Sequence, residues 1–468
     1  MWPFLLIIAC KPAGVTGPKA DVDVMYTADF DPVLRTVLHI DITTPDPTTA
    51  VVNWGLSADS LTRSTPQSAT GTLHQIDLIG VGQNREVHWQ LVLDPGGEEV
   101  HMPVQTAHAP TLDLPDLTIL SHDPTRSELN DGWVLAAVID ESVSGIVAWD
   151  VEGRASWGWN AGPDYTVAWP AGSPDGKDLL VLLANRDRMI DDTTIHRIPM
   201  NGAPRTLTEA ATGHHGFALL PDGQLAWLGL TFADQDVSAL GLADTPWLVM
   251  ADTVWVAPEG VSHGQGTILY DYFQDWPHPF YLPCTHPLYL EQRLGETVHE
   301  WTHSNSLAYV PEWDAVLVGT RLHDSIIAID RQSGTHLWQA GGVHGFPVDS
   351  PWSHGHFSDA WEGGLLMFDN GLHHDTQISR LMELSIDPVA GTVEVVWEWE
   401  QPNSGFTSFL GDARRLPGGH ILAAFTEIGI LAEIDPADGA IVWEAKINQS
   451  LIAGRTRYTP SLYALPPG

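Results

Sequence analysis

The sequence contains few cysteines, few basic residues and, after its first ten residues, no long hydrophobic run. Two cysteines in 468 residues exclude a disulfide scaffold and a cysteine-rich metal site. Only 21 lysines and arginines stand against 59 acidic residues, and the net charge of −38 excludes nucleic acid and anionic lipid headgroups as general partners. No later segment approaches the roughly 20 apolar residues that a membrane helix needs.

The residues that are plentiful indicate a turn-rich protein with a sizeable core. Hydrophobic residues make up 43% of the chain and aromatic residues 9%, which is enough to bury such a core. The 43 glycines and 34 prolines predict frequent turns and few long helices. Because no Asp-x-Asp-x-Asp-Gly loop of the calcium-binding kind occurs, the acidic residues are interpreted as a solvated surface.

The first ten residues are apolar and end in Ile7-Ile8-Ala9-Cys10. This ending resembles a bacterial lipobox, in which the cysteine becomes the lipidated first residue. We interpret residues 1–25 as a lipoprotein-type signal and linker, with a lipid anchor at Cys10 and a location in the cell envelope, periplasmic or on the outer membrane or cell surface. A shortened ordinary signal peptide is the alternative. With Cys10 lipidated, Cys284 has no partner and is expected to be a free thiol.

Short alternating segments separated by polar turns follow this linker. The clearest are Val37–Ile42, Ala50–Trp54, His74–Ile79 and Val87–Leu93. Strands of this length and spacing predict a small, fibronectin-like β-sandwich domain over residues 26–112. A proline-bounded junction precedes the next domain, which begins at residue 116.

Residues 116–468 contain a weak internal repeat, in which a β-rich run is followed by Asp, Gly and a strand that carries Trp. The two copies with identical spacing are Asp330-Gly334-Trp338 and Asp435-Gly439-Trp443. Shorter or degenerate copies have their Asp or Asn at positions 150, 201, 252 and 387. Two hairpins per unit make one four-stranded blade, so six units predict a six-bladed β-propeller, whose tryptophans fill the wedges between blades. A parallel β-solenoid is the competing architecture.

Three histidines occupy similar positions ahead of the first turn in three units. His215 and His356 lie seven residues before a turn, His303 lies eight residues before one, and Arg321 ends the strand after His303. The innermost strands of a propeller line one channel, so we expect these side chains to converge. Three imidazoles can bind a metal. With Arg321 they can instead bind a tetrahedral oxyanion, which we favour because the guanidinium would repel a divalent cation, and no metal is expected.

The same segments resemble the bacterial arylsulfate sulfotransferases. The motifs appear in the family's order: His214-His215, Trp301-Thr-His303-Ser-Asn305, Gly319-Thr-Arg321, Phe368-Asp-Asn-Gly371, Ile378-Ser-Arg380, Val393–Trp397 and Gly411–Leu422. The resemblance covers the propeller, above all residues 300–468, and less of the N-terminal sandwich. The sequence has Gly319 where the family often has Ser, and Gly355-His356 where it often has Gln-His.

The resemblance implies a channel-centred active site that moves a sulfuryl group from an aryl sulfate to a phenol, with no nucleotide sulfate donor and no cofactor. It implies a sulfohistidine intermediate on His356; His354, two residues earlier, is the alternative nucleophile. Arg321, His215 and His303 are expected to hold the sulfate oxygens, and Asn305 to donate another hydrogen bond. A phenolate must be protonated as it leaves, and the acceptor phenol must later lose its proton. We expect His303 to carry out both proton transfers.

Three other classes of function stay open on the sequence alone. A propeller that has kept the fold but serves as a non-catalytic binding or scaffold protein of the cell envelope is the main alternative. A quinone-dependent dehydrogenase would require a calcium site, for which no loop is present. A metal hydrolase built on the same histidines would contain zinc after purification.

Overall fold

The computed structural model describes residues 23–466, except 95, 113, 140–143, 186–191, 204, 211, 244, 263–264, 283, 285–296, 362, 403–404 and 448–451. The predicted lipobox and Cys10 therefore lie outside the described residues. The chain is built almost wholly from antiparallel strands, which confirms the predicted all-β class. No helix among the described residues has the length and apolar character to cross a membrane.

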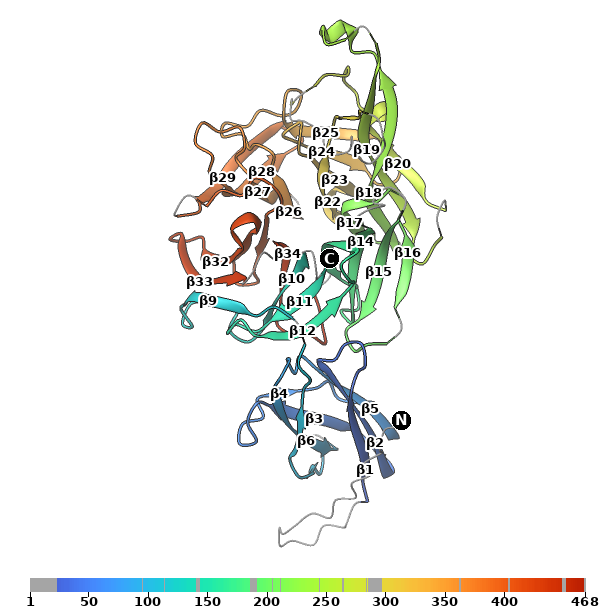
Figure 1. Cartoon of the computed structure of the whole chain (residues 1–468), viewed down its shortest axis with the longest axis vertical. Helices are drawn as coiled ribbons and strands as arrows, with labels where there is room; N and C mark the ends of the chain where they lie inside the picture. Colours follow the sequence, from blue (N-terminus) through green and yellow to red (C-terminus); the bar gives the residue numbers. More distant parts are fainter. Residues whose placement is uncertain are drawn as a thin grey trace.

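The N-terminal part contains two sheets that share one core (Figure 1). One sheet contains β1 (Met25–Phe30), β2 (Val37–Thr48) and β5 (Gly71–Ile79). The other contains β3 (Ala50–Gly55), β4 (Arg63–Ser64), β6 (Glu86–Leu93), β7 (Val100–His101) and β8 (Gln105–His108). Strands alternate buried and exposed side chains, as in Leu38 and Ile40 of β2 and Trp89 and Leu91 of β6, and these inward faces meet. The domain limits and the fibronectin likeness stay predictions.

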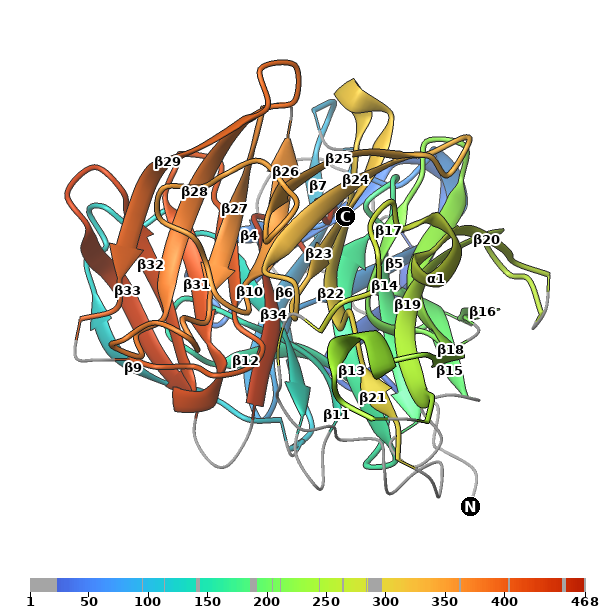
Figure 2. The ribbon, with the colours of Figure 1, turned by 90° about the horizontal axis from the view of Figure 1, so that it is seen from above.

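The rest of the described chain forms six sheets arranged in a ring (Figures 1 and 2). The first contains β34 (Ile452–Thr459), β10 (Trp133–Ile139), β11 (Ser144–Trp149) and β12 (Ala155–Asn160). The second contains β13 (Tyr165–Gly172), β14 (Asp178–Asn185), β15 (Thr193–Pro199) and β16 (Thr206–Glu209). The third contains β17 (His214–Leu219), β18 (Gln224–Gln235), β19 (Trp247–Pro258), β20 (Thr267–Asp271) and β21 (His299–Glu300).

Three further sheets complete the ring. The fourth contains β22 (Ser304–Val310), β23 (Ala315–Thr320), β24 (Ser325–Asp330) and β25 (His336–Gly341). The fifth contains β26 (His356–Trp361), β27 (Gly364–Asp369), β28 (Arg380–Asp387) and β29 (Thr392–Glu400). The sixth contains β30 (Asp412–Arg415), β31 (Ile421–Phe425), β32 (Ile430–Asp435), β33 (Ala440–Ile447) and β9 (Leu117–His122). Short helices are α1 (Tyr272–Asp275), η1 (Ser238–Leu240), η2 (Pro311–Trp313) and η3 (Thr426–Ile428).

The six innermost strands contact one another in a closed circle. In order they are β34, β13, β17, β22, β26 and β30, and β30 contacts β34 again. The ring is therefore a propeller with one channel, as the sequence predicted. Both ends of the propeller segment close it, because β34 pairs with β10 and β9 pairs with β33.

The Asp-to-Gly repeat marks the turn between the third and fourth strands of a sheet. The amide of Gly334 donates to the carbonyl of Asp330, and the amide of Gly439 donates to that of Asp435, both at 2.9 Å. Each glycine has a positive φ, 71° and 72°, which glycine adopts without strain. The faint repeat marker at Asp252 was wrong, since this residue lies within β19, and its carboxylate has another use.

Tryptophans join neighbouring sheets, as predicted. The indole N–H of Trp157 donates to Met200 in the second sheet at 3.0 Å, and that of Trp443 donates to Val151 in the first at 2.9 Å. Both indoles are fully buried. Each tryptophan therefore fills the wedge between two sheets, and its indole N–H donates a hydrogen bond to the next sheet.

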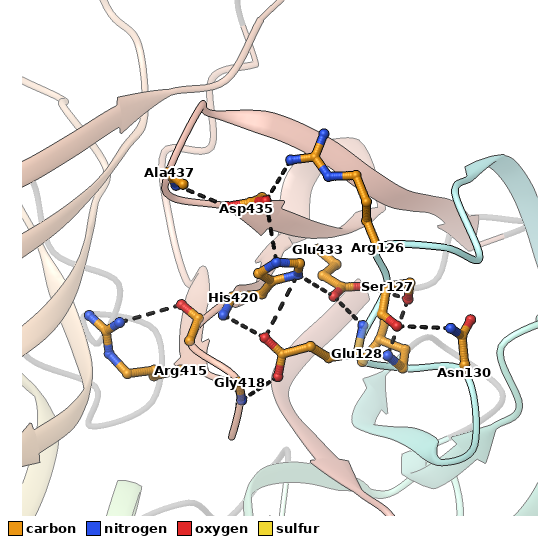
Figure 3. Close-up of polar contacts among 12 residues, drawn as sticks. Arg126, Ser127, Glu128, Asn130, Arg415, Gly418, His420, Glu433, Asp435 and Ala437 are labelled. Atoms are coloured by element: carbon orange, nitrogen blue, oxygen red, sulfur yellow. Dashed lines mark hydrogen bonds and ion pairs between the residues drawn. The ribbon is translucent and has the colours of Figure 1, made fainter.

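A polar clasp holds the loop after β9 against the sixth sheet (Figure 3). The buried carboxylate of Glu433 accepts hydrogen bonds from Ser127 Oγ, from the backbone amide of Glu128 and from His420. The side chain of Glu128 accepts from the backbone amides of Gly418 and His420, at 2.5 and 2.8 Å. These bonds link the beginning of the propeller sequence, just after β9, to its last complete sheet.

Candidate active site

The channel end of β26 carries the residue expected to act as nucleophile. The His356 side chain is 2% exposed, and its Nε2 atom has no hydrogen-bond partner among the described residues. Burial lowers the pKa of His356 well below its usual value, and the positive charges of Arg455 and Arg321 lower it further. A neutral imidazole, whose Nε2 has no partner among the described residues, thus lies within electrostatic reach of two guanidinium groups.

His215, on β17, faces His303 across the channel entrance. Their rings meet edge to face with centroids 5.1 Å apart. Burial lowers the pKa of His215 far below its usual value, with further contributions from His214, His303 and His356. The structure therefore brings the three sequence-predicted histidines together.

A relay that the sequence did not indicate lies behind His215. Its Nδ1 is 2.8 Å from Nδ1 of His214, and Nε2 of His214 is 3.1 Å from Oδ1 of the buried Asp252. Burial acts to raise the pKa of Asp252, but hydrogen bonds from His214, Thr302 and the Ser304 amide outweigh it and hold the pKa below its usual value. Asp252 on β19 thus fixes the His214-His215 pair.

His303 lies just before β22 with a left-handed φ of 47°, an uncommon conformation for a residue with a side chain. Its Nδ1 is 2.7 Å from Oε1 of Glu300 on β21. The side chain is 22% exposed, more open than that of His356. A carboxylate at one ring nitrogen fixes the orientation of the imidazole, so the arrangement suits proton transfer. Glu300 is a second residue missed from the sequence.

Arg455, on β34, is the third site residue that the sequence analysis did not identify. It is buried, and it donates to the carbonyl of Asn305 at 2.8 Å, to that of Phe357 at 3.2 Å and to the carboxylate of Asp412 at 3.1 Å. Burial lowers the pKa of Arg455 to about 10, so it keeps its charge at neutral pH. One guanidinium therefore ties the first, fourth, fifth and sixth sheets together beside His356.

Asn305 has a different place from the one expected. Its side-chain Nδ2 donates to the carbonyl of Gly355 at 3.1 Å, and its Oδ1 accepts from Ser306. Gly355 immediately precedes His356. Asn305 therefore positions the nucleophile loop and has only its second Nδ2 hydrogen for a substrate.

The assumed equivalence of His303 and His356 is corrected. The carbonyl of Thr302 accepts a hydrogen bond from the Leu322 amide, and the carbonyl of Ser353 accepts the equivalent bond from the Gly371 amide. The next residue in each case, His303 or His354, has a left-handed φ, 47° or 58°. His354 is thus the counterpart of His303 on the fifth sheet. His356 corresponds to Asn305, one pleat further into the channel.

The Phe-Asp-Asn-Gly and Ser-Arg motifs support the His356 loop. Oδ1 of the fully buried Asp369 accepts from the amides of Ser353 and Gly371, at 2.8 and 2.9 Å. Its other oxygen lies 2.8 Å from the guanidinium of Arg380. These residues form the support of the loop.

A cavity of about 710 Å³ lies among the innermost strands β17, β22, β26, β30 and β34. Arg414, Arg457 and Asp359 line it together with Phe217 and Leu307. The cavity volume is within the range of small-molecule sites.

Residues 284–458 match the family model for arylsulfotransferase (ASST). This match supports the resemblance to the arylsulfotransferase family over this region of the chain. The match contains His303, Arg321, His356 and Arg455, whereas His215 and Asp252 precede it. Among curated proteins, no sequence matches the chain.

Solved structures similar to the chain include three with low identity. A nidogen/laminin complex chain is 12% identical, covers 70% of this chain and 98% of its own, and has a TM-score of 0.41. A protein of unknown function from Bacteroides caccae is 12% identical, covers 71% and 100%, and has a TM-score of 0.43. The Cps50 (Swd1) β-propeller domain of Myceliophteria thermophila is 12% identical, covers 70% and 89%, and has a TM-score of 0.35.

Proposed function

We propose that the protein is an arylsulfate sulfotransferase that moves a sulfuryl group from an aryl sulfate to a phenol through a sulfohistidine. The observation that carries the proposal is the buried, unpartnered Nε2 of His356 beside Arg321 and Arg455. A lone pair and fixed positive charges are what an in-line sulfuryl transfer requires, because charge builds up on the equatorial sulfate oxygens.

The first step forms a bond between Nε2 of His356 and sulfur and breaks the bond from sulfur to the aryl oxygen. The electron pair leaves with that oxygen as a phenolate, and the proton on His303 neutralises it. In the second step a phenol attacks the same sulfur, His303 takes its proton, and the nitrogen–sulfur bond breaks. Glu300 holds the imidazole of His303 in position for both proton transfers.

The relay behind His215 supplies a donor to the sulfate. Both ring nitrogens of His214 have a partner within 3.1 Å, Asp252 at Nε2 and Nδ1 of His215 at Nδ1. With the hydrogen of the Nδ1–Nδ1 bond on His214, the neutral His215 has its proton on Nε2, the nitrogen away from His214, and donates from there to the sulfate. A neutral donor here adds no further positive charge to a channel that already holds two guanidinium groups.

The test is release of nitrophenol from para-nitrophenyl sulfate, with and without added phenol. Release that depends on phenol and disappears in His356→Asn, but not in the exposed control His108→Asn, is the expected result. Mass spectrometry of the enzyme treated with donor alone then locates the sulfuryl group. A label on His354 moves the nucleophile by two residues, and no release by wild type with several phenols favours the non-catalytic binding protein.

We further propose that the protein is a lipoprotein of the cell envelope anchored through Cys10. The lipobox-like ending Ile7-Ile8-Ala9-Cys10 supports this location. Its test is given among the predictions below.

A further inference from the structure

Three metal-ligating side chains from separate segments converge beside the nucleophile loop. Sγ of Cys284 is 3.5 Å from Nε2 of His373, and that nitrogen is 3.1 Å from Nε2 of His354. All three ligand atoms lie within 4.8 Å of one another. Cys284 follows α1, His354 precedes β26, and His373 follows β27.

The two measured separations, 3.5 and 3.1 Å, fit the edges of one tetrahedron. Zinc lies about 2.3 Å from a thiolate and about 2.0–2.1 Å from an imidazole nitrogen, so tetrahedral ligands are roughly 3.3 Å apart for two nitrogens and roughly 3.6 Å for nitrogen and sulfur. The rings of His354 and His373 stand at 88° to each other with their Nε2 atoms facing. A single ion can therefore contact both nitrogens without a change of fold.

The two histidine loops are held in place by a shared support. The amide of His354 donates to Asp324 at 2.6 Å, and the amide of His373 donates to Ser353 Oγ at 3.0 Å. The amide of Ser353 donates in turn to Asp369. Because the backbones of His354 and His373 are already held in place, the chain loses less conformational entropy when a metal binds.

The segment that carries Cys284 is also fastened. The indole N–H of Trp301 donates to the carbonyl of Tyr281 at 2.8 Å, and the Tyr281 hydroxyl is 2.9 Å from Nδ1 of His323. Cys284 is three residues beyond this anchor. Cys284 thus belongs to the connection between β20 and β21 of the third sheet, which contacts His323 of the fourth sheet, and its thiol lies beside the two histidines of the fifth sheet.

We propose that Cys284, His354 and His373 bind one Zn²⁺ ion. A thiolate and two imidazoles are ligands that zinc prefers over magnesium or calcium, and three protein ligands leave a fourth position for water or an anion. The ion would tie Cys284 to the loop that leads into His356. This inference replaces the expectations of a metal-free protein and of a free thiol at Cys284.

A second cluster, Glu128, His420 and Glu433, also has three ligand atoms close together. Its carboxylate oxygens already accept hydrogen bonds from Ser127 and from the amides of Glu128, Gly418 and His420 (Figure 3). A metal there would displace the clasp of the sixth sheet. We therefore place the zinc only at the Cys284 cluster.

The experiment uses the full chain, stripped with a chelator and titrated with Co²⁺ and then Zn²⁺. One equivalent of Co²⁺ should produce near-ultraviolet thiolate-to-metal absorption, which one equivalent of Zn²⁺ removes. Cys284→Ser should abolish that absorption, and His373→Gln should weaken Zn²⁺ binding at least about tenfold. His374→Gln, one residue further on, is the matched control and should bind as wild type.

Two outcomes overturn the proposal. One is no stoichiometric Zn²⁺ binding by the wild type at micromolar concentration. The other is binding that persists unchanged in Cys284→Ser and His373→Gln, because the ion is then elsewhere among the 22 histidines. Circular dichroism of each variant checks the fold. Since the readout is metal binding, the result does not depend on sulfuryl transfer, and either proposal can fail alone.

Discussion

The guanidinium of Arg455 donates a hydrogen bond to the backbone carbonyl of Asn305 at 2.8 Å, and so joins the last strand of the propeller to the fourth sheet. The two residues are 150 positions apart. The same guanidinium is paired with the fully buried carboxylate of Asp412. One side chain thus links four sheets around the channel and contributes a positive charge near His356.

Arg455→Met is expected to destabilise the protein by about 3–5 kcal/mol, because it leaves the charge of Asp412 buried without this partner. Urea unfolding followed by tryptophan fluorescence measures the loss. Asp412→Asn in the same chain should restore part of it. Losses that simply add in the double variant would show that the two side chains are not coupled.

His303→Gln should slow transfer by about 10²–10⁴-fold from phenyl sulfate and much less from para-nitrophenyl sulfate, whose leaving phenolate needs little protonation. Rates measured over a series of phenyl sulfates check this dependence. Glu300→Gln should show the same trend with a smaller loss. An equal loss for every leaving group would assign His303 to sulfate binding instead.

Asp252→Asn should lower kcat by about 10²-fold with little change in KM, since His214 and His215 lose the carboxylate that orients them. Steady-state kinetics with para-nitrophenyl sulfate and phenol measure both constants. The control is Asp234→Asn, an exposed carboxylate on the neighbouring strand β18. Wild-type kcat in a folded Asp252→Asn protein would remove the relay from the mechanism.

Burial lowers the pKa of His196 on β15 to about 4, with a contribution from Arg205. The unfolded chain, with a histidine pKa of about 6.5, binds a proton that the folded chain excludes between these values. Stability from this residue is therefore complete above pH 6.5 and is lost as the pH falls toward 4, by about 3 kcal/mol. Denaturant unfolding across this pH range should show a shallower loss in His196→Gln than in His108→Gln.

Cys10→Ala should release the protein from the membrane fraction of cells that express the full chain. Metabolic labelling with a fatty acid should label the wild type and not the variant, with Cys284→Ala as the control that keeps the label. Unlabelled, freely soluble wild-type protein would identify the N-terminus as an ordinary signal peptide.

The strand pattern, the Asp-to-Gly turns and the tryptophan spacing were enough to predict an all-β propeller, because each unit repeats the same local chemistry. The sequence also identified His215, His303, Arg321 and His356, since a channel brings the first strands of all blades together. Local sequence determines the strands and turns, and the structure confirms them. The structure also brings the three histidines together, and their catalytic roles stay predictions.

Only the tertiary structure assigned Asp252, Glu300, Arg455 and the Cys284 cluster. Asp252 meets His214 through strand pairing within the third sheet, and Arg455 reaches Asn305 because β34 returns to close the ring. No spacing in the sequence encodes such contacts, since they depend on how blades are placed around the axis. The same placement decided that Asn305 supports the His356 loop and that His354, not His356, is the counterpart of His303.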